Sequence, residues 1–169
     1  DKAAGRLDET EHPFTTGTFD DVRITTHFYP ERMASAIFST IHESGHALYE
    51  QGISKTLHRT PLADGASMAV HESQSRMWEN LVGRSRAFWK YFFPRLVKIF
   101  PQQLANVSME QFYRAINKVQ PSFIRTDADE ATYNLHVMLR MELEIGLMEG
   151  RIEVKDLPEL WNAKMKEYL

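Results

Sequence analysis

The most constraining feature of this sequence is the pattern His-Glu-x-x-His at residues 42–46, set in a largely apolar stretch. Residues four apart in a helix lie on the same face one turn apart, so the imidazoles of His42 and His46 can reach one ion. Glu43 follows His42 directly, and its carboxylate therefore lies to the side of that ion, where a water molecule would be held. A catalytic zinc site needs three protein ligands, an open position and a nearby base. The pattern predicts a helix that supplies two ligands and the base.

The alternative interpretation of this pattern is an ordinary solvated face of a helix. The residues around it are mostly apolar, namely Ile37, Phe38, Ile41, Ala47 and Leu48, and this favours burial of the two histidines. Burying two imidazoles and a carboxylate without partners costs free energy, and a metal ion is a partner that suits all three. Glycine destabilises a helix interior by roughly 1 kcal/mol relative to alanine, so we expect Gly45 to lie where another group approaches closely.

The composition of the chain is that of an ordinary globular domain. Its 169 residues suffice for one domain with a real core, and 43% are hydrophobic and 25% charged. The net charge of −3 gives no basic excess, so we expect neither a nucleic-acid partner nor an anionic membrane surface. The absence of cysteine excludes disulfides, thiol nucleophiles and cysteine zinc sites. It fits a reducing compartment, and with no visible signal peptide or membrane span we expect a cytoplasmic protein.

Periodicity and helix-boundary residues predict a mainly α fold with a small antiparallel β element near the N-terminus. Residues 1–10 read as a loosely held lead-in. Strands are expected at 14–18 and 22–28, joined by a turn at 19–21. In the first half of the chain, helices are expected at 31–51, with Gly52 as the stop, at 66–82, interrupted by Gly83, and at 86–100, kinked or broken by Pro94. In the second half, a helix opens at Pro101, and another at 108–118 begins with a capping box of Ser108 and Gln111. The last two helices are expected at 128–149, capped by Thr126 or Asp127 and ended by Gly150, and at 156–168.

The third metal ligand must come from farther along the chain. Glu72, 26 residues after His46, is our choice, because one loop and a returning helix fit that interval. His71 and Gln74 beside it favour a buried polar cluster, whereas most helical glutamates lie on the surface. His136 is the competing third ligand, and its alternative role is a hydrogen-bonded core histidine.

Four segments of the chain resemble one family of enzymes. HESGHALYEQG and HESQSRMWEN resemble the carboxypeptidase Taq family of zinc metallocarboxypeptidases, as do HPFTTGTFDDVRITTHF upstream and IRTDADEATYNLHVMLR downstream, in the same order. The resemblance implies a helical metallopeptidase fold with His42, His46 and Glu72 as metal ligands and Glu43 as general base. It implies one divalent metal, with zinc expected first and cobalt as the alternative. Members of the family are often dimers, so a homodimer is one expected assembly.

A carboxypeptidase must also hold the free C-terminal carboxylate of its peptide substrate, and a guanidinium does so with two parallel hydrogen bonds. The resemblance implies that Arg23 and Arg125 bind substrate in this way. Each has an alternative role as an ion-pair partner of a neighbouring carboxylate, with Asp20, Asp21, Asp127 and Asp129 as the candidates. His71, Asp129 and Glu130 are expected outside the ligand set, where such groups orient an imidazole.

Two departures from the family and two rival functions qualify this interpretation. Position 27 is His where the family often has arginine. Known members of the family are also longer chains, so we expect residues 1–169 to be a single domain that forms the metal-binding central part of a longer fold. One rival is an endopeptidase of the thermolysin type, but the aspartate expected four residues after Glu72 is Arg76. The other is a truncated metal-binding remnant without activity.

Overall fold

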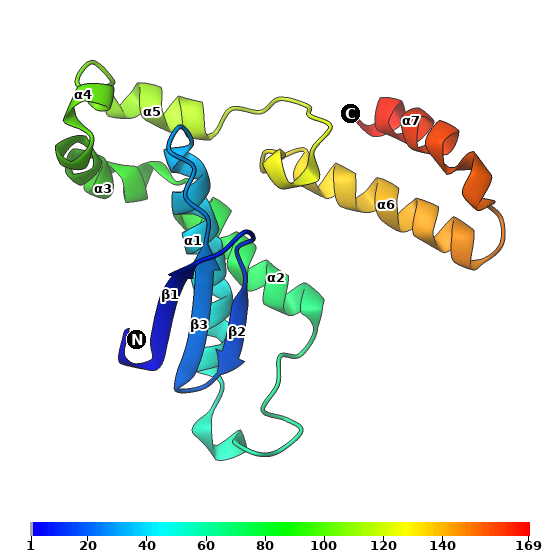
Figure 1. Ribbon diagram of the computed structural model, residues 1–169, viewed down its shortest axis with the longest axis horizontal. Helices are drawn as coiled ribbons and strands as arrows, with labels where there is room; N and C mark the ends of the chain where they lie inside the picture. The colour runs from blue at the N-terminus through cyan, green and yellow to red at the C-terminus, as the bar shows by residue number, and fades with distance from the viewer. Residues whose placement is uncertain (1) are drawn as a thin grey trace. The chain divides into compact units, whose positions relative to one another are not determined.

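The computed structural model describes residues 2–169, and its contacts divide the chain into two compact units, Asp1–Ile116 and Asn117–Leu169 (Figure 1). The predicted fold class is confirmed, because the described elements are mainly helices with one small sheet near the N-terminus. No helix in the described part of the chain combines the length and the apolar composition that spanning a membrane requires.

The sheet of the first unit has the order β1-β3-β2. β2 (Thr15–Thr18) and β3 (Asp21–Thr26) form the predicted antiparallel hairpin, in which Gly17 and Phe19 have φ angles of 98° and 51°. The expectation of a loose lead-in is wrong at β1 (Gly5–Glu9), which pairs parallel to β3. This edge strand is mostly exposed and polar, so the periodicity of its sequence gives no signal, and its backbone pairing with β3 holds it in place.

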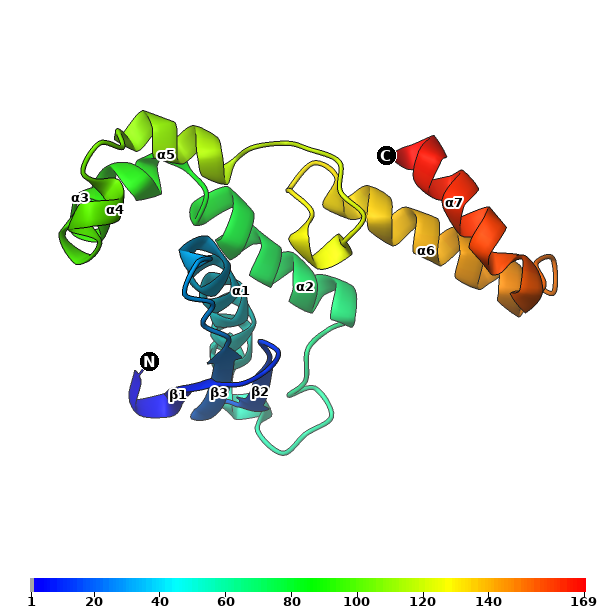
Figure 2. The same cartoon turned by 45° about the horizontal axis from the view of Figure 1, so that its top comes forward.

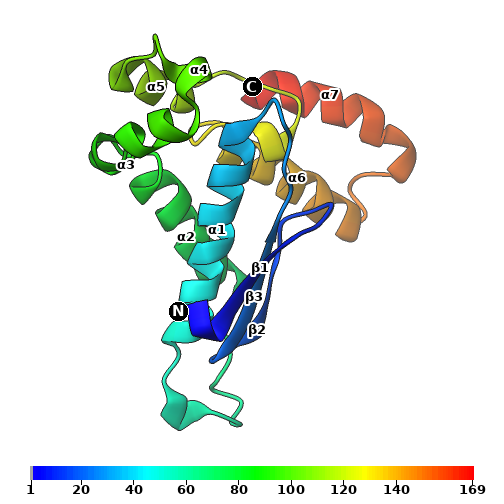
Figure 3. The same ribbon diagram turned by 60° about the vertical axis from the view of Figure 1, so that its left-hand side comes forward.

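Helix α1 (Met33–Gly52) packs against this sheet on one side and against α2 (Met68–Arg76) on another (Figure 3). Figure 2 shows the strands beside the C-terminal part of α1 and α2 alongside it. The expectation that α1 ends at Gln51 with Gly52 as the stop beyond it is off by one residue. Gly52 is the last helical residue, Ile53 follows in extended backbone, and Gly17 and Gly150 are the glycines of the described chain with positive φ.

The rest of the first unit completes an aromatic core. η3 (Met77–Val82) is a π-helix that continues α2, and α3 (Arg86–Ile99), α4 (Pro101–Leu104) and α5 (Met109–Ile116) follow it. Two short 3₁₀ helices, η1 (Lys2–Ala4) and η2 (Lys55–Leu57), lie earlier in the chain. α3 runs through Pro94 without a break, and Ser108 and Gln111 form the predicted capping box before α5. The buried core comprises Phe38, Trp89, Phe93, Leu96, Leu104 and Phe112.

The second unit is built on a helical hairpin. η4 (Arg125–Asp127) precedes α6 (Tyr133–Met148), and η5 (Val154–Asp156) leads into α7 (Leu157–Tyr168), with Leu139, Leu143 and Met165 buried between the two helices. α6 begins five residues later than predicted, and neither Thr126 nor Asp127 caps it. Asp129 accepts hydrogen bonds from the backbone N–H of Ala131 and Thr132, which favours a turn there over continued helix. Gly150 ends this stretch with a φ of 70°, as predicted.

Candidate metal centre

Three of the predicted site residues converge between α1 and α2. The Nε2 atoms of His42 and His46 lie 3.4 Å and 3.3 Å from Oε2 of Glu72, and one ligand atom from each residue lies within 4.8 Å of the others. Both histidine side chains are mostly buried, at 16% and 13% exposure. Two imidazole nitrogens and one carboxylate oxygen at these separations fit a single divalent ion, and two histidines with a glutamate form a known donor set of catalytic zinc sites.

The close approach of α2 to α1 depends on Gly45. A Cβ atom at this position would lie 2.6 Å from Cα of Ser75, a separation that real Cβ atoms essentially never show, and 3.0 Å from the backbone oxygen of Gln74. Ser75 is itself fully buried at this crossing. The sequence expectation of a close approach at Gly45 is therefore confirmed, and the approaching group is the backbone of the helix that carries Glu72.

Glu79 holds the ring of His42 from the side away from Glu72. Its Oε2 lies 2.9 Å from Nδ1 of His42 and accepts a hydrogen bond of 3.0 Å from Nη1 of Arg76. Its Oε1 accepts a hydrogen bond of 3.2 Å from Nη2 of Arg84, so the buried carboxylate has cationic partners on both oxygens. Sequence reasoning missed Glu79, although its place seven residues after Glu72, two turns along the same helix, is a usable signal.

The π-helix η3 places this carboxylate. The N–H of Gly83 donates a hydrogen bond of 2.8 Å to the carbonyl of Trp78, five residues earlier, whereas an α-helix would bond to the residue four earlier. A Cβ atom at Gly83 would lie 2.8 Å from the backbone oxygen of Glu79, so glycine is needed at this turn. The expected interruption at Gly83 is confirmed, because η3 ends at Val82 and α3 begins only at Arg86.

His46 is held by a second pair of residues. Its Nδ1 lies 2.6 Å from Nδ1 of His71, and Nε2 of His71 lies 2.8 Å from Oε1 of Glu50. His71 thus lies where a residue that orients an imidazole would lie. Glu50 was not predicted, although positions 42, 46 and 50 follow each other at four-residue intervals on one face of α1.

The carboxylates around the histidines give the site a negative electrostatic potential. Burial alone would lower the pKa of His42, but the hydrogen bonds and charges of Glu72 and Glu79 outweigh it and raise this pKa to about 9 in the metal-free chain. Burial would raise the pKa of Glu72, and hydrogen bonds from His42 and His46 outweigh it and lower that pKa well below its usual range. The potential that keeps a proton on His42 also favours a divalent cation in its place.

Glu43 is buried, at 7% exposure, and Thr15 of β2 holds it. The Thr15 hydroxyl lies 2.7 Å from Oε2 of Glu43 and donates to it, and it lies 3.0 Å from the backbone oxygen of the same residue. Thr15 was not predicted to touch the site. The contact connects the β-hairpin to the helix of the metal centre, because β2 supplies the donor and α1 the acceptor.

The predicted substrate-binding arginines have partners in the structure. Arg23 on β3 is 54% exposed and forms a two-point ion pair with Asp21, with both N–O distances at 2.9 Å, which is the alternative role considered for it. Arg125 donates a hydrogen bond of 2.5 Å from Nη1 to the hydroxyl of Tyr133 within the second unit. Neither contact involves a metal ligand, so binding of substrate by either arginine stays a prediction.

The remaining predicted residues also belong to the second unit. Asp129 caps the turn before α6, where hydrogen bonds from Gln120 and Thr132 help to lower its pKa against the opposing effect of burial. Glu130 is exposed. His136, the competing ligand, is fully buried beside Arg140, and the group of described residues able to hold a metal consists of His42, His46 and Glu72 without it.

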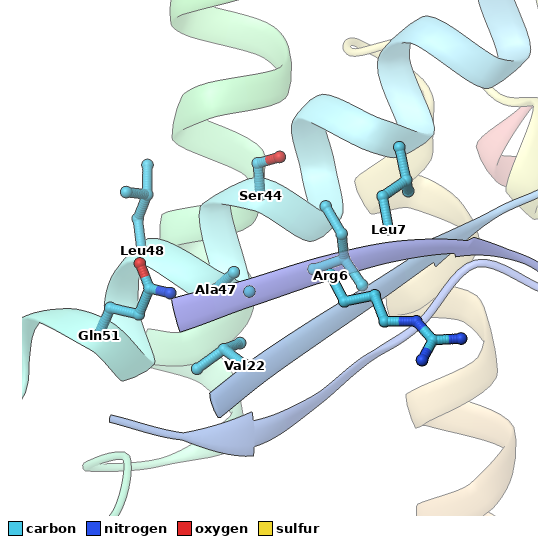
Figure 4. Close-up of a pocket in the computed structure, with 9 residues that line it drawn as sticks. Arg6, Leu7, Val22, Ser44, Ala47, Leu48 and Gln51 are labelled. Carbon is cyan, nitrogen blue, oxygen red and sulfur yellow. The ribbon is translucent and has the colours of Figure 1, made fainter. Parts of the chain in front are cut away.

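A groove of about 350 Å³ lies on a different face of α1, between that helix and strands β1 and β3 (Figure 4). Arg6, Leu7, Val22, Ser44, Ala47, Leu48 and Gln51 are among its lining residues. None of the predicted site residues lines it, so we treat the groove as separate from the metal centre.

Comparison with known proteins agrees with this geometry. Thermostable carboxypeptidase 1 of Thermus thermophilus is 53% identical over 170 residues, which is 100% of this chain and 33% of that protein. Carboxypeptidase 1 of Bacillus subtilis is 49% identical, covering 98% of this chain and 33% of its own length. The crystal structure of an M32 carboxypeptidase from Deinococcus radiodurans R1 superimposes with a TM-score of 0.97 at 53% identity, over 100% of this chain and 34% of that one.

The chain therefore spans about a third of the length of the relatives it matches. The match to the family model extends over residues 1–169, and the resemblance seen in the four sequence segments is confirmed. The chain belongs to the carboxypeptidase Taq (M32) metallopeptidase family.

Proposed function

We propose that this chain is the catalytic region of a zinc-dependent metallocarboxypeptidase, which hydrolyses the last peptide bond of peptides with a free C-terminus. The observation that carries the proposal is the convergence of His42, His46 and Glu72 next to a buried Glu43 on the same helix. Membership of the family and the names of the similar proteins support the same function.

The metal would be held by Nε2 of His42, Nε2 of His46 and the carboxylate of Glu72. We propose one divalent ion, zinc rather than cobalt, because this donor set is typical of zinc in hydrolases. When bound, such an ion supplies Lewis-acid chemistry, by activating water and polarising the peptide carbonyl. Glu79 orients the ring of His42 through its Nδ1, and His71 does the same for His46.

Glu43 is the proposed general base and acid. It takes a proton from the attacking water as the new C–O bond forms, and it gives a proton to the leaving nitrogen as the C–N bond breaks. The hydrogen bond from Thr15 to Oε2 fixes the carboxylate and leaves Oε1 for this transfer. Because Glu43 is buried, proton transfer takes place away from bulk water.

Arg23 and Arg125 are the proposed partners of the substrate carboxylate, with Asp129 and Glu130 as supporting carboxylates. For Arg23, binding means exchanging Asp21 for the substrate carboxylate, and an exposed ion pair permits this because it contributes little stability. We further propose that residues 1–169 form a single domain, the central part of a longer metallocarboxypeptidase fold. A homodimer and a cytoplasmic location are the assembly and place that we expect for it.

The Glu43→Gln variant tests the proposal. Glutamine keeps the size and the acceptor for Thr15 but cannot take a proton, so turnover should fall by about 10²-fold to 10⁴-fold while metal content is unchanged. Glu31→Gln, at an exposed position before α1, is the matched control and should behave as wild type. The substrates are one peptide with a free C-terminus and the same peptide amidated.

Each outcome has a distinct meaning. Trimming of the free peptide alone supports the carboxypeptidase, and internal cleavage of the amidated peptide would indicate the endopeptidase instead. Full turnover by Glu43→Gln would contradict the role of the base. Metal binding without any hydrolysis by the wild-type chain would favour the metal-binding remnant.

A further inference from the structure

Three side chains form a line behind the metal centre: His46, His71 and Glu50. The two ring Nδ1 atoms of His46 and His71 are 2.6 Å apart, and Nε2 of His71 is 2.8 Å from Oε1 of Glu50. Glu50 and His46 come from α1 and His71 from α2, so the line connects the same two helices as the metal ligands. Glu50 has no place in the mechanism above.

Metal binding fixes the direction of the hydrogen bonds in this line. If Nε2 of His46 faces the metal, the proton of this neutral ring must be on Nδ1, which then donates to Nδ1 of His71. His71 can accept on Nδ1 only if its own proton is on Nε2, and Nε2 then donates to Glu50. The reverse order would place a proton on Nε2 of His46 and block the ligand atom.

The position of His71 is tightly constrained. The ring of Tyr49 meets it edge-on, with centroids 4.9 Å apart and an interplanar angle of 78°. The hydroxyl of Tyr49 accepts a hydrogen bond of 3.1 Å from the N–H of Ala66, which fixes that ring in turn. A Cβ atom at Gly65 would lie 3.1 Å from Cδ2 of His71, so the loop also packs closely on the imidazole.

Glu50 is in a costly place for a carboxylate. It is 8% exposed, and its Oε2 is a buried oxygen without a hydrogen-bond partner among the described residues. A buried, half-satisfied carboxylate destabilises a fold relative to an apolar side chain of similar size. Packing therefore does not account for a glutamate at this position, and its hydrogen bond with His71 does.

We propose that Glu50 and His71 form a directed hydrogen-bond relay that sets the tautomer and the ring orientation of His46. Glu50 is a positioning residue, because it acts on the metal through two other side chains. Glu79 orients the ring of His42 by direct contact, and Glu50 orients the ring of His46 through His71. Each metal-binding histidine is thus oriented by a carboxylate outside the ligand set. This inference rests on the metal site proposed above.

The first test reads the tautomers by nitrogen NMR on the full 169-residue chain loaded with zinc, with ¹⁵N-labelled histidine. The relay requires the proton of His46 on Nδ1 and the proton of His71 on Nε2. A zinc-loaded chain with the proton of His71 on Nδ1 would overturn the relay, and this readout needs no variant and no turnover.

The second test measures zinc affinity by competition with a chromogenic chelator. Glu50→Leu removes the acceptor and should weaken zinc binding by about 10-fold to 100-fold, whereas Glu50→Gln keeps an acceptor for His71 and should recover most of this loss. The metal-free Glu50→Leu chain should be at least as stable as wild type, which separates positioning from a structural defect.

The outcomes separate the relay from the metal site. Wild-type zinc affinity in Glu50→Leu would overturn the relay alone. A wild-type chain that binds no zinc would overturn the metal site and the relay together. If Glu50→Leu does not fold, Glu50→Gln decides: its zinc-loaded form must show the wild-type tautomers, and a changed tautomer of His71 would contradict the relay.

Discussion

Replacement of Gly45 by alanine tests how the two helices of the metal centre are held together. The new Cβ atom would lie 2.6 Å from Cα of Ser75, whereas ordinary contact begins at 3.4 Å, so the two backbones must separate by about 0.8 Å. The clash is between backbone and Cβ atoms, and no side-chain rotation can relieve it. α2 must move, and Glu72 moves with it.

The size of the effect follows from where the strain is released. Overpacking of this kind costs about 1–3 kcal/mol. In the metal-free chain α2 can move outward, and alanine improves the helix by up to about 1 kcal/mol, so stability should change little. Binding a metal draws Glu72 back towards His42 and His46 and restores the strain. Since about 1.4 kcal/mol corresponds to a factor of ten, metal affinity should fall by about 10-fold to 100-fold.

Gly52→Ala is the matched control, because it lies at the end of the same helix and a Cβ atom there meets nothing within 4 Å. Zinc affinity is measured by chelator competition and stability by denaturant unfolding of the metal-free chains. The control should keep wild-type affinity. Gly45→Ala with wild-type affinity and normal folding would refute the idea that contact between the two helices positions Glu72.

Three further predictions concern the contacts around the site. Glu79→Leu should lower metal affinity by about 10-fold to 100-fold, because the ring of His42 loses its partner; unchanged affinity in a chelator competition would contradict this role. Thr15→Val should lower turnover by about tenfold at unchanged metal content, because Glu43 loses its hydrogen bond. The exposed Thr16→Val is its control, and equal rates in both variants would count against the contact. Metal at 100 times its dissociation constant should add about 2.7 kcal/mol to the free energy of unfolding, measured with and without a chelator, and equal values would argue against a bound ion.

The sequence predicts the structure best where a short local pattern determines it. The spacing of His42 and His46 within an apolar stretch predicts the helix, and the helix predicts their common face. Gly45 predicts a close approach because glycine is unfavourable there without one. The interval of 26 residues between His46 and Glu72 allows one loop and a returning helix, and the structure brings Glu72 to the histidines.

The contacts that sequence reasoning missed are set by tertiary structure. Thr15 reaches Glu43 across 28 residues, and no local spacing predicts this pair. Glu79 reaches His42 across 37 residues, and its seven-residue interval from Glu72 is a local signal for its face of the helix but not for this contact. No periodicity in the sequence marks the π turn that carries Glu79, although a Cβ atom at Gly83, which closes this turn, would clash with the backbone oxygen of Glu79. β1 was missed because an exposed edge strand lacks an alternating pattern.

The start of α6 was placed too early for a local reason. Residues 128–132 are Ala-Asp-Glu-Ala-Thr, a composition that a helix tolerates, but Asp129 accepts hydrogen bonds from the backbone N–H groups of Ala131 and Thr132 in a turn. Burial of His136 was foreseen as the alternative to a ligand role, and it lies in the core of the second unit.

The most direct test of the central claim is the metal content of the purified chain after zinc loading and dialysis, compared with the variant His46→Leu. The account predicts one zinc per wild-type chain and a loss of bound zinc in the variant, since two ligands alone hold the ion poorly. Equal zinc in both chains would contradict the assignment of His42, His46 and Glu72 as the metal centre.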